Sequence, residues 1–265
     1  VVLVAYTAYK TDGMLINRYT NKNTAGIERA DFTTGRLKLL ENELSYLNDI
    51  NVFPVADGDT GNNLLQTLRT IVVESKMEDS FSNTLESISN SALIGARGNS
   101  GVIFAQFVNG LQKSNGTKDS VSMEEFTKLV EYSFEHTYSS LSNPVEGTMI
   151  TIMRDFSIAL KKSLSTVKTI KDFFQSAYNR IKESLTDTTK MLDVLSENDV
   201  VDSGAMGFVL FVQGIVSYYN NDEVDISEYE NIEHIDEHHY EGDITYRYCT
   251  EGLVQYTSLK ETNLK

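Results

Sequence analysis

The stretch "NVFPVADGDTGNNLLQTLRTIV" (51–72) combines two features from which the architecture can be predicted. Its first half is a break of Gly, Asp and Asn, residue types that favour loops and turns. Its second half carries apolar residues at the three- and four-residue spacing of one helix face, namely Leu64, Leu65, Leu68, Ile71 and Val72. Because a glycine-containing break followed by an amphipathic segment recurs along the chain, the sequence predicts a helical protein.

The helical spacing extends from about residue 30 to residue 219. Ser122 and Glu125 have the spacing of a capping box, in which two side chains pair with two backbone N–H groups at a helix N-terminus. No convincing strand pattern lies between the apolar stripes. We therefore predict an all-α fold, either a helix bundle or a helical barrel, with helices near residues 37–47, 64–72, 81–92, 101–112, 122–134, 147–163, 170–186, 187–196 and 203–219.

Charge and cysteine content narrow the class of protein. The formal net charge is −15 and the pI is about 4.7. A nucleic-acid binder needs Lys and Arg to displace counterions from phosphates, so nucleic-acid binding is not expected. The single cysteine, Cys249, excludes an internal disulfide and is typical of a cytoplasmic protein. No apolar run approaches the ~20 residues that span a bilayer, so no transmembrane segment is expected.

Changes in composition predict the domain organisation. Residues 1–29 are expected to form an N-terminal arm that precedes a helical domain over 30–220. Residues 221–243 are predicted to be an acidic linker, because they include ten Asp or Glu residues and no Lys or Arg. Residues 244–265 are expected to be the truncated start of an α/β domain.

The break at 51–63 is the first candidate site. Asp57 and Asp59 can point to one side of an irregular loop, and Asn51 comes within reach if Pro54 bends the chain. Such hard oxygen ligands suit Mg²⁺, which proteins commonly share with phosphates. An Asx-rich turn that caps the following helix accounts for the same residues equally well.

Three further breaks are candidates. "GARGNSG" (95–101) lets backbone N–H groups approach a phosphate at a helix start, but a close helix crossing would need the same small residues. "DSGAMG" (202–207) has no companion His motif, so a Ser-His-Asp hydrolase is not expected. "NPVEGTM" (143–149) contains the second of the two prolines.

In this order, "NVFPVADGDTGNN", "GARGNSGVIFAQ", "NPVEGTM" and "VVDSGAMG" resemble the ATP-binding domain of bacterial fatty acid kinases. That domain is related to the ADP-binding subunit of dihydroxyacetone kinases, in the Dak phosphatase-like family. The resemblance covers about residues 30–220 and implies an up-and-down barrel of about eight antiparallel helices, with the nucleotide at one end. One departure is Ala56, which stands where the family commonly has Pro.

The resemblance also implies roles for individual residues. Asp57 and Asp59 would act through two Mg²⁺ ions bridging the nucleotide phosphates, with Asn51 in place of a third metal ligand. Phosphates, base and ribose of ATP or ADP would contact Thr60, Gly61, Asn62, Asn63, Gly98, Asn99, Ser100, Thr148, Met149, Asp202 and Gly204. Arg97 would either stabilise the transferring phosphoryl group or serve the fold, and Cys249 could contribute to a metal site in the next domain.

The implied activity is transfer of the γ-phosphoryl group of Mg-ATP to a fatty acid carboxylate, presented by a separate fatty-acid-binding protein. A carboxylate is already deprotonated at neutral pH, so acyl phosphate formation needs positioning and charge neutralisation rather than a general base. A dihydroxyacetone-type kinase subunit and a non-catalytic nucleotide-sensing module remain alternatives. A phosphatase is not expected, and a homodimer of the full-length protein stays open.

Overall fold

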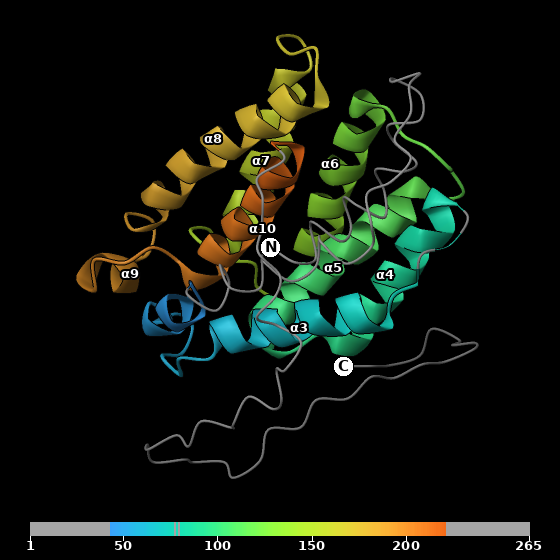
Figure 1. Cartoon of the computed structure of the whole chain (residues 1–265). Coiled ribbons are helices and arrows are strands. Elements are labelled where there is room, and N and C mark those ends of the chain that lie inside the picture. The colour runs from blue at the N-terminus through green and yellow to red at the C-terminus, as the bar shows by residue number, and fades with distance from the viewer. Residues whose placement is uncertain (1–42, 77, 79, 221–265) are drawn as a thin grey trace. The chain divides into compact units, whose positions relative to one another are not determined.

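The computed structural model describes residues 43–76, 78 and 80–220. All regular structure among these residues is helical, which confirms the all-α prediction (Figure 1). The predictions for residues 1–42 and 221–265, including the arm, the linker, the second domain and Cys249, lie outside the described residues. Residues 43–49 are helical, and the further helices are α3 (Thr60–Glu74), α4 (Phe81–Gly95), α5 (Gly98–Asn115), α6 (Met123–Ser140), α7 (Met149–Ser163), α8 (Ile170–Thr188), α9 (Asp193–Glu197) and α10 (Ser203–Tyr219).

The long helices follow one another as an up-and-down barrel. Each of α3 to α7 packs against the next helix in sequence, and α10 packs against α8, α7 and α3, which closes the ring. A hydrogen bond supports the closure, since Ser203 Oγ donates to Leu47 O at 2.5 Å across 156 positions of the chain. Short connections make neighbouring helices antiparallel. Therefore α3, α5, α7 and α10 all begin at the same end of the barrel.

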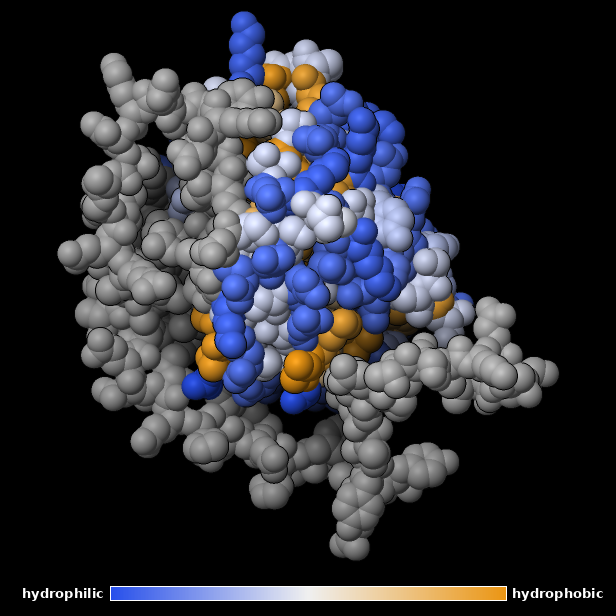
Figure 2. Space-filling view, turned by 90° about the vertical axis from the view of Figure 1, so that its right-hand side faces the viewer, coloured by the Kyte–Doolittle hydropathy of each residue, from blue (hydrophilic) through white to orange (hydrophobic). Residues whose placement is uncertain are grey.

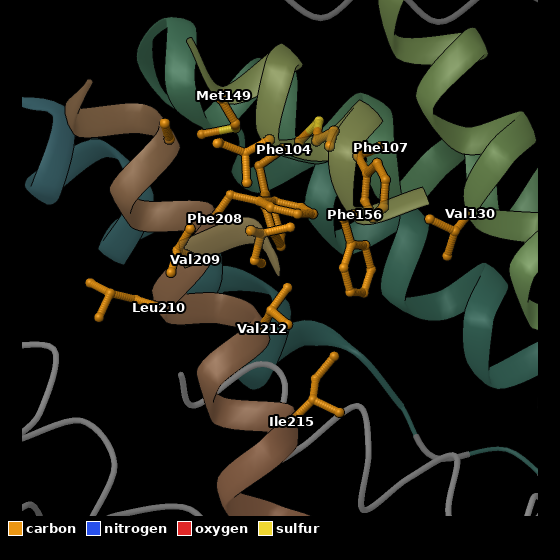
Figure 3. Packing of buried hydrophobic residues seen from close by; sticks show 14 of the residues in the cluster. Phe104, Phe107, Val130, Met149, Phe156, Phe208, Val209, Leu210, Val212 and Ile215 are labelled. Carbon is orange, nitrogen blue, oxygen red and sulfur yellow. The ribbon is translucent and has the colours of Figure 1, made fainter. Parts of the chain in front are cut away.

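Aromatic side chains from three helices meet in the core. Phe208 on α10 is fully buried and makes edge-to-face contacts with Phe107 on α5, at 5.2 Å between ring centroids, and with Phe156 on α7, at 5.9 Å (Figure 3). Phe104 on α5 packs in the same way on Phe211 of α10, at 4.9 Å. These geometries are the favourable ones for aromatic pairs. These aromatic contacts therefore connect α10 to both α5 and α7 inside the barrel.

The helices that begin at the opposite end have ordinary side-chain caps. The capping box predicted for Ser122 and Glu125 is confirmed: Glu125 N donates to Ser122 Oγ at 3.2 Å, and Ser122 N donates to Glu125 Oε2 at 2.8 Å. Ser80 caps α4 and Thr169 caps α8 through the same kind of bond to the third helical N–H group. These caps satisfy N–H groups that lack a partner within the helix.

One predicted helix, over 187–196, is wrong. Helix α8 continues to Thr188, and the next helix, α9, covers five residues only. Thr188 Oγ1 donates to Leu185 O at 2.7 Å, and Thr189 Oγ1 donates to Val200 O at 2.9 Å. Threonine hydroxyls that bond to the backbone compete with continued helix, which explains the turn at this point.

The outer face of the barrel is polar. Figure 2 shows mainly hydrophilic side chains over the described part of one side, with apolar residues in small, separate spots. This arrangement is expected when amphipathic helices turn their apolar faces inward. None of the described helices has both the length and the apolar character that a bilayer crossing demands.

Candidate functional site

The loop before α3 places Asp57 and Asp59 next to each other. Gly58 between them has a φ of +65°, in the left-handed region that glycine adopts without strain. The side chain of Asn51, which is 5% exposed, spans the loop: Nδ2 donates to Asp57 Oδ1 at 2.7 Å, and Oδ1 accepts from Thr60 Oγ1 at 2.9 Å. The predicted proximity of Asn51 to the aspartates is thus present in the structure.

The two carboxylates influence each other. Burial raises the pKa of Asp59, a hydrogen bond with Asn63 opposes that rise, and the neighbouring charge of Asp57 adds to it. Asp57 itself is exposed, and Asp59 is half-buried. A like-charged pair of this kind is relieved by a bound cation, because the cation attracts both carboxylates. The pair is therefore an electrostatically suitable place for a metal ion.

Helix α3 is not capped by its own N-cap residue. Asp59 occupies the N-cap position, yet its side chain accepts no capping hydrogen bond. Instead, Asn48 Oδ1 accepts from Gly61 N at 2.8 Å and from Asn62 N at 3.4 Å. A Cβ built on Gly61 would lie 2.8 Å from that same Oδ1, so only glycine admits the approach. The interpretation of the two aspartates as helix caps therefore does not account for their side chains, and Asn48 is absent from the residues predicted.

The break between α4 and α5 packs against the first turns of α3. Gly98 has a φ of +56°, and a Cβ built on it would lie 2.1 Å from Asn63 Nδ2. Thr67 Oγ1 accepts from Arg97 N at 3.1 Å, and Arg97 Nη1 donates to Ala96 O at 2.7 Å. The close helix contact considered for this glycine-rich break is thus present. The Arg97 guanidinium donates to a neighbouring carbonyl, which favours a structural role for Arg97 over a role in phosphoryl transfer.

The first turns of α5, α7 and α10 meet around Gly204. A Cβ built there would lie 3.3 Å from Asp202 Oδ2, 3.3 Å from Ser100 Oγ and 3.4 Å from Met149 Cε. The second, third and fourth glycine-containing breaks of the sequence therefore converge. Asn99, which lies in the first turn of α5, is exposed.

Asp202 joins the starts of two helices. It is 4% exposed and caps α10, with Oδ2 accepting from Ala205 N at 2.7 Å, and the backbone N–H of Met149 at the start of α7 also donates to its carboxylate. Its own N–H donates to Thr188 Oγ1 at 3.2 Å. Burial raises the pKa of Asp202 to about 6, although both N–H bonds lower it. The buried carboxylate therefore fixes the first turns of α7 and α10 relative to each other.

The loop before α7 is held in place by side chains of that helix. Thr148 is the N-cap residue of α7, but its Oγ1 donates to Val145 O at 2.7 Å and makes no cap bond. Gly147 has a φ of +86°, and its N donates to Thr151 Oγ1 at 2.8 Å. A Cβ on Gly147 would lie 2.7 Å from Met191 Cβ, so the loop rests on the turn between α8 and α9.

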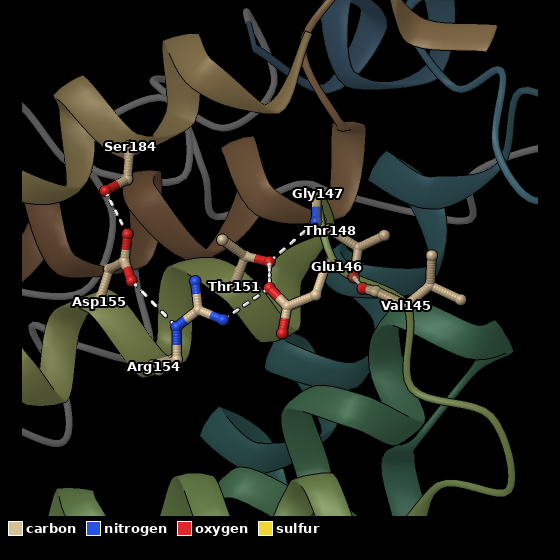
Figure 4. A network of polar contacts seen from close by, with 8 residues as sticks. All are labelled: Val145, Glu146, Gly147, Thr148, Thr151, Arg154, Asp155 and Ser184. Carbon is tan, nitrogen blue, oxygen red and sulfur yellow. Dashed lines mark hydrogen bonds and ion pairs between the residues drawn. The ribbon is translucent and has the colours of Figure 1, made fainter. Parts of the chain in front are cut away.

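Figure 4 shows the network that anchors this loop. Glu146 Oε2 accepts from Thr151 Oγ1 at 2.6 Å and from Arg154 Nη1 at 2.7 Å. Arg154 Nε also contacts Asp155 Oδ1 at 3.2 Å, and Ser184 Oγ on α8 donates to Asp155 Oδ2 at 2.5 Å. None of these residues was predicted from the sequence. The sole hint is an Arg among the apolar residues of the predicted helix.

The residues at the start of α3 fit a magnesium ion. No three His, Cys, Asp or Glu side chains gather into a metal site in residues 43–76, 78 and 80–220. Asp57 and Asp59 supply two carboxylates, and Asn51 would supply a third oxygen if its amide turned over. Thr60 Oγ1 can accept from the amide nitrogen as well as donate to the oxygen, so the bond to Thr60 is kept in either orientation. The turned amide would exchange its bond to Asp57 for an oxygen directed at the cation. Two or three protein oxygens suffice for Mg²⁺ that shares its other positions with water and phosphates.

Comparison with known proteins identifies the family and the fold. Residues 54–217 match the sequence model of the DAK2 domain. The match includes all four glycine-containing breaks, apart from residues 51–53 of the first one. The chain belongs to the DAK2 domain family. The dihydroxyacetone kinase of C. freundii has a similar fold, with a TM-score of 0.52 and 14% sequence identity over 75% of this chain and 38% of that one.

Similar sequences occur in bacteria. An uncharacterized protein of Mycoplasma pneumoniae is 34% identical over 233 residues, which cover 82% of this chain and 42% of that protein. An uncharacterized protein of Mycoplasma genitalium is 35% identical over 224 residues, 79% of this chain and 40% of that protein. The chain thus spans about two fifths of the length of these curated relatives.

Proposed function

We propose that the barrel is the nucleotide-binding domain of a kinase that transfers the γ-phosphoryl group of Mg-ATP to a fatty acid carboxylate. One observation carries the proposal. The N-termini of α3, α5 and α7 lie at the same end of the barrel as the Asp57 and Asp59 pair, and none is capped by the side chain of its own N-cap residue.

The contrast with the opposite end strengthens this argument. There, α4, α6 and α8 begin with the side-chain caps of Ser80, Ser122 and Thr169. A helix N-terminus carries partial positive charge and N–H donors, which favour phosphate groups. At the Asp57 and Asp59 end, Asn48 accepts from first-turn N–H groups of α3 and Asp202 accepts from those of α7 and α10, so the start of α5 offers the least occupied donors. A phosphate-binding site beside two carboxylates is the arrangement that a metal-bound nucleotide requires.

The residues divide the task as follows. Asp57, Asp59 and Asn51 would hold Mg²⁺, which neutralises charge on the transferring phosphoryl group. The first turns of α3 and α5 would bind the phosphates through Thr60, Gly61, Asn62, Asn63, Gly98, Asn99 and Ser100. Thr148 and Met149 would face the base or ribose, and Asp202 with Gly204 would complete the pocket.

A carboxylate acceptor suits a site without a histidine base. His136 is the single histidine among the described residues, and it lies on α6, bonded to Asn109 Oδ1 at 3.2 Å. An alcohol must lose a proton during transfer, whereas a carboxylate at neutral pH has none to lose. Together with the motif resemblance to bacterial fatty acid kinases, this supports a fatty acid delivered by a separate acyl-binding protein.

A dihydroxyacetone-type kinase subunit is the second candidate. The fold similarity to the dihydroxyacetone kinase of C. freundii favours it. The two candidates share the Mg-nucleotide site and differ in the acceptor. A nucleotide-sensing module would share the site and transfer no phosphoryl group.

Calorimetry with ATP and ADP, with and without Mg²⁺, tests the shared site. We expect Mg²⁺-dependent binding that weakens at least about tenfold in Asp57→Asn/Asp59→Asn, because both metal ligands lose their charge. Asp187→Asn is the matched control, since it removes an exposed carboxylate that pairs with Lys190 on the outside of the molecule. Equal binding by wild type and the double variant would refute the proposed site.

Phosphoryl transfer from radiolabelled ATP then separates the acceptors. Transfer to a fatty acid in the presence of an acyl-binding protein, and none to dihydroxyacetone, is the expected result. Transfer to dihydroxyacetone alone would favour the second candidate. Binding without transfer to either acceptor would favour the sensing module.

A further inference from the structure

We propose that Asn48 is a positioning residue for the Asp57 and Asp59 pair, an inference that rests on the proposed Mg-nucleotide site. Asn48 lies at the end of the helical residues 43–49, which precede the loop and α3. Its Oδ1 accepts from Gly61 N at 2.8 Å and from Asn62 N at 3.4 Å. These are the second and third residues of α3, the N–H groups that an N-cap side chain normally binds.

The N-cap residue of α3 is Asp59, which is one of the most favourable residue types for capping. In α10 the equivalent residue, Asp202, does cap, accepting from Ala205 N at 2.7 Å. Asp59 is prevented from doing the same because Asn48 Oδ1 already occupies the position in front of the α3 N–H groups. The capping task is thus transferred to a residue eleven positions earlier in the chain.

This transfer leaves the Asp59 carboxylate beside Asp57 rather than over the helix N-terminus. A carboxylate that caps its own helix spends its lone pairs on backbone N–H groups and loses freedom to bind a metal. Asn48 therefore keeps both carboxylates directed at one point. It does not touch the metal position itself, so it acts through Asp59.

Gly61 makes the cap from Asn48 possible. A Cβ there would lie 2.7 Å from Leu44 O and 2.8 Å from Asn48 Oδ1, so the side chain of Asn48 reaches the helix only because residue 61 has none. Replacement of Asn48 by Ala leaves the N–H groups of Gly61 and Asn62 without their acceptor. Asp59, the N-cap residue, then exchanges its bond with Asn63 for a cap on α3 and leaves the pair.

The test compares Asn48→Ala with Asn48→Asp and Ser122→Ala in the full 265-residue chain. Asp retains an acceptor at the same place, whereas Ser122→Ala removes an ordinary cap on α6, at the opposite end of the barrel. Thermal unfolding without ligand measures the structural effect of each change. Binding of Mn²⁺, followed by paramagnetic resonance with and without ADP, measures the site.

We expect Asn48→Ala and Ser122→Ala to lower the unfolding temperature by similar amounts. Only Asn48→Ala should weaken Mn²⁺ binding, by about 10- to 100-fold, as for the loss of a residue that orients metal ligands. Asn48→Asp should restore binding to within a few-fold of wild type, as expected from the similar capping strength of Asn and Asp.

Three results would overturn the inference: wild-type Mn²⁺ affinity in Asn48→Ala, an equal loss of affinity in Ser122→Ala, or no rescue by Asn48→Asp. If Asn48→Ala fails to fold, Asn48→Asp and Asn48→Ser decide the matter, because both retain an acceptor oxygen and only Asp can reach the N–H groups. A wild-type chain that binds neither Mn²⁺ nor ADP would contradict the proposed function itself.

Discussion

The side chain of Asn63 on α3 occupies the space that a side chain at position 98, at the start of α5, would need. A Cβ added to Gly98 would lie 2.1 Å from Asn63 Nδ2 and 2.7 Å from Asn63 Cγ, far inside normal contact distance. Asn63 is also hydrogen-bonded to Asp59. The position of α5 is thereby coupled, through a single amide side chain, to the carboxylate pair.

Gly98→Ala should therefore disturb both stability and the site. The substitution places Ala in the left-handed region and adds a clash, which together cost about 2–4 kcal/mol of unfolding free energy. Because Asn63 must move, Mg²⁺-dependent ADP binding should weaken as well. Urea unfolding and calorimetry measure the two effects.

Gly116→Ala is the matched control for this change. Gly116 also has a positive φ, +58°, with a ψ of −120° that glycine alone adopts readily, but a Cβ there would meet nothing within 4 Å. Gly116→Ala should cost about 1–3 kcal/mol through the backbone conformation alone and leave ADP binding unchanged. Equal losses of ADP affinity in the two variants would show that the contact of Gly98 with Asn63 does not affect the site.

Asp202→Asn should stabilise the fold near neutral pH. The pKa of Asp202 is raised from 3.8 to about 6, so the folded state binds a proton more tightly than the unfolded state. Its contribution to the unfolding free energy is therefore greatest below pH 3.8, and it falls as the pH rises to about 6. At about 1.4 kcal/mol per pH unit, removal of the charge recovers up to about 3 kcal/mol.

Urea unfolding of wild type and Asp202→Asn across this pH range measures the difference. The gap between the two proteins should be largest at pH 7 and should narrow toward pH 4. Asp202→Ala serves as the comparison, because it also loses the acceptor for Ala205 N and Met149 N and should be less stable than Asp202→Asn. A gap that does not change with pH would contradict the prediction.

Arg154→Met should weaken nucleotide binding without affecting Mn²⁺ alone. Arg154 holds Glu146, and Glu146 holds the loop that leads to Thr148 and Met149. Loss of this half-exposed contact should cost about 1 kcal/mol of unfolding free energy, and a similar loss in binding would lower ADP affinity about fivefold. Calorimetry with ADP and resonance measurements with Mn²⁺ separate the two kinds of binding.

Lys161→Met provides the control on the same helix. Lys161 pairs with Glu131 of α6 on the exposed surface. Such pairs contribute about 0–1 kcal/mol, so neither ADP nor Mn²⁺ affinity should change. An equal loss of ADP affinity in both variants would indicate a general effect on α7 rather than the anchoring of one loop.

Phe208→Ala should be the most destabilising of these substitutions. Phe208 is fully buried and contacts aromatic rings of α5, α7 and its own helix. Its removal leaves a cavity where three helices meet, at a cost of about 3–5 kcal/mol. Phe208→Leu should cost clearly less, and equal losses in unfolding free energy would show that the cavity collapses in both.

Local signals in the sequence predict the fold well. The Ser122 and Glu125 pair predicts the start of α6, because both partners of a capping box lie within one turn of helix. The exception is the segment after Thr188, where helical spacing continues but hydroxyl groups bond to the backbone instead. Spacing shows which residues can share a face, and it cannot show which hydrogen bonds the side chains will choose.

The contacts of the candidate site were predictable where the residues are close in sequence and were not predictable where they lie on distant helices. Asp57, Asp59 and Asn51 are close in sequence, and the structure brings them together as predicted. The contacts of Gly98 with Asn63 and of Gly204 with Ser100 depend on how closely helices distant in sequence approach each other. Asn48 escapes prediction for a similar reason, since its role depends on the close approach permitted by Gly61.

The closure of the ring by α10 has a consequence for the order in which the chain acquires its site during synthesis. The helices from α3 to α8 can pack on their neighbours as they leave the ribosome. The wall formed by Ser203 and Gly204, however, belongs to the last described helix, and its bond to Leu47 spans 156 positions. A nascent chain is therefore unable to assemble the complete proposed pocket until α10 has been released.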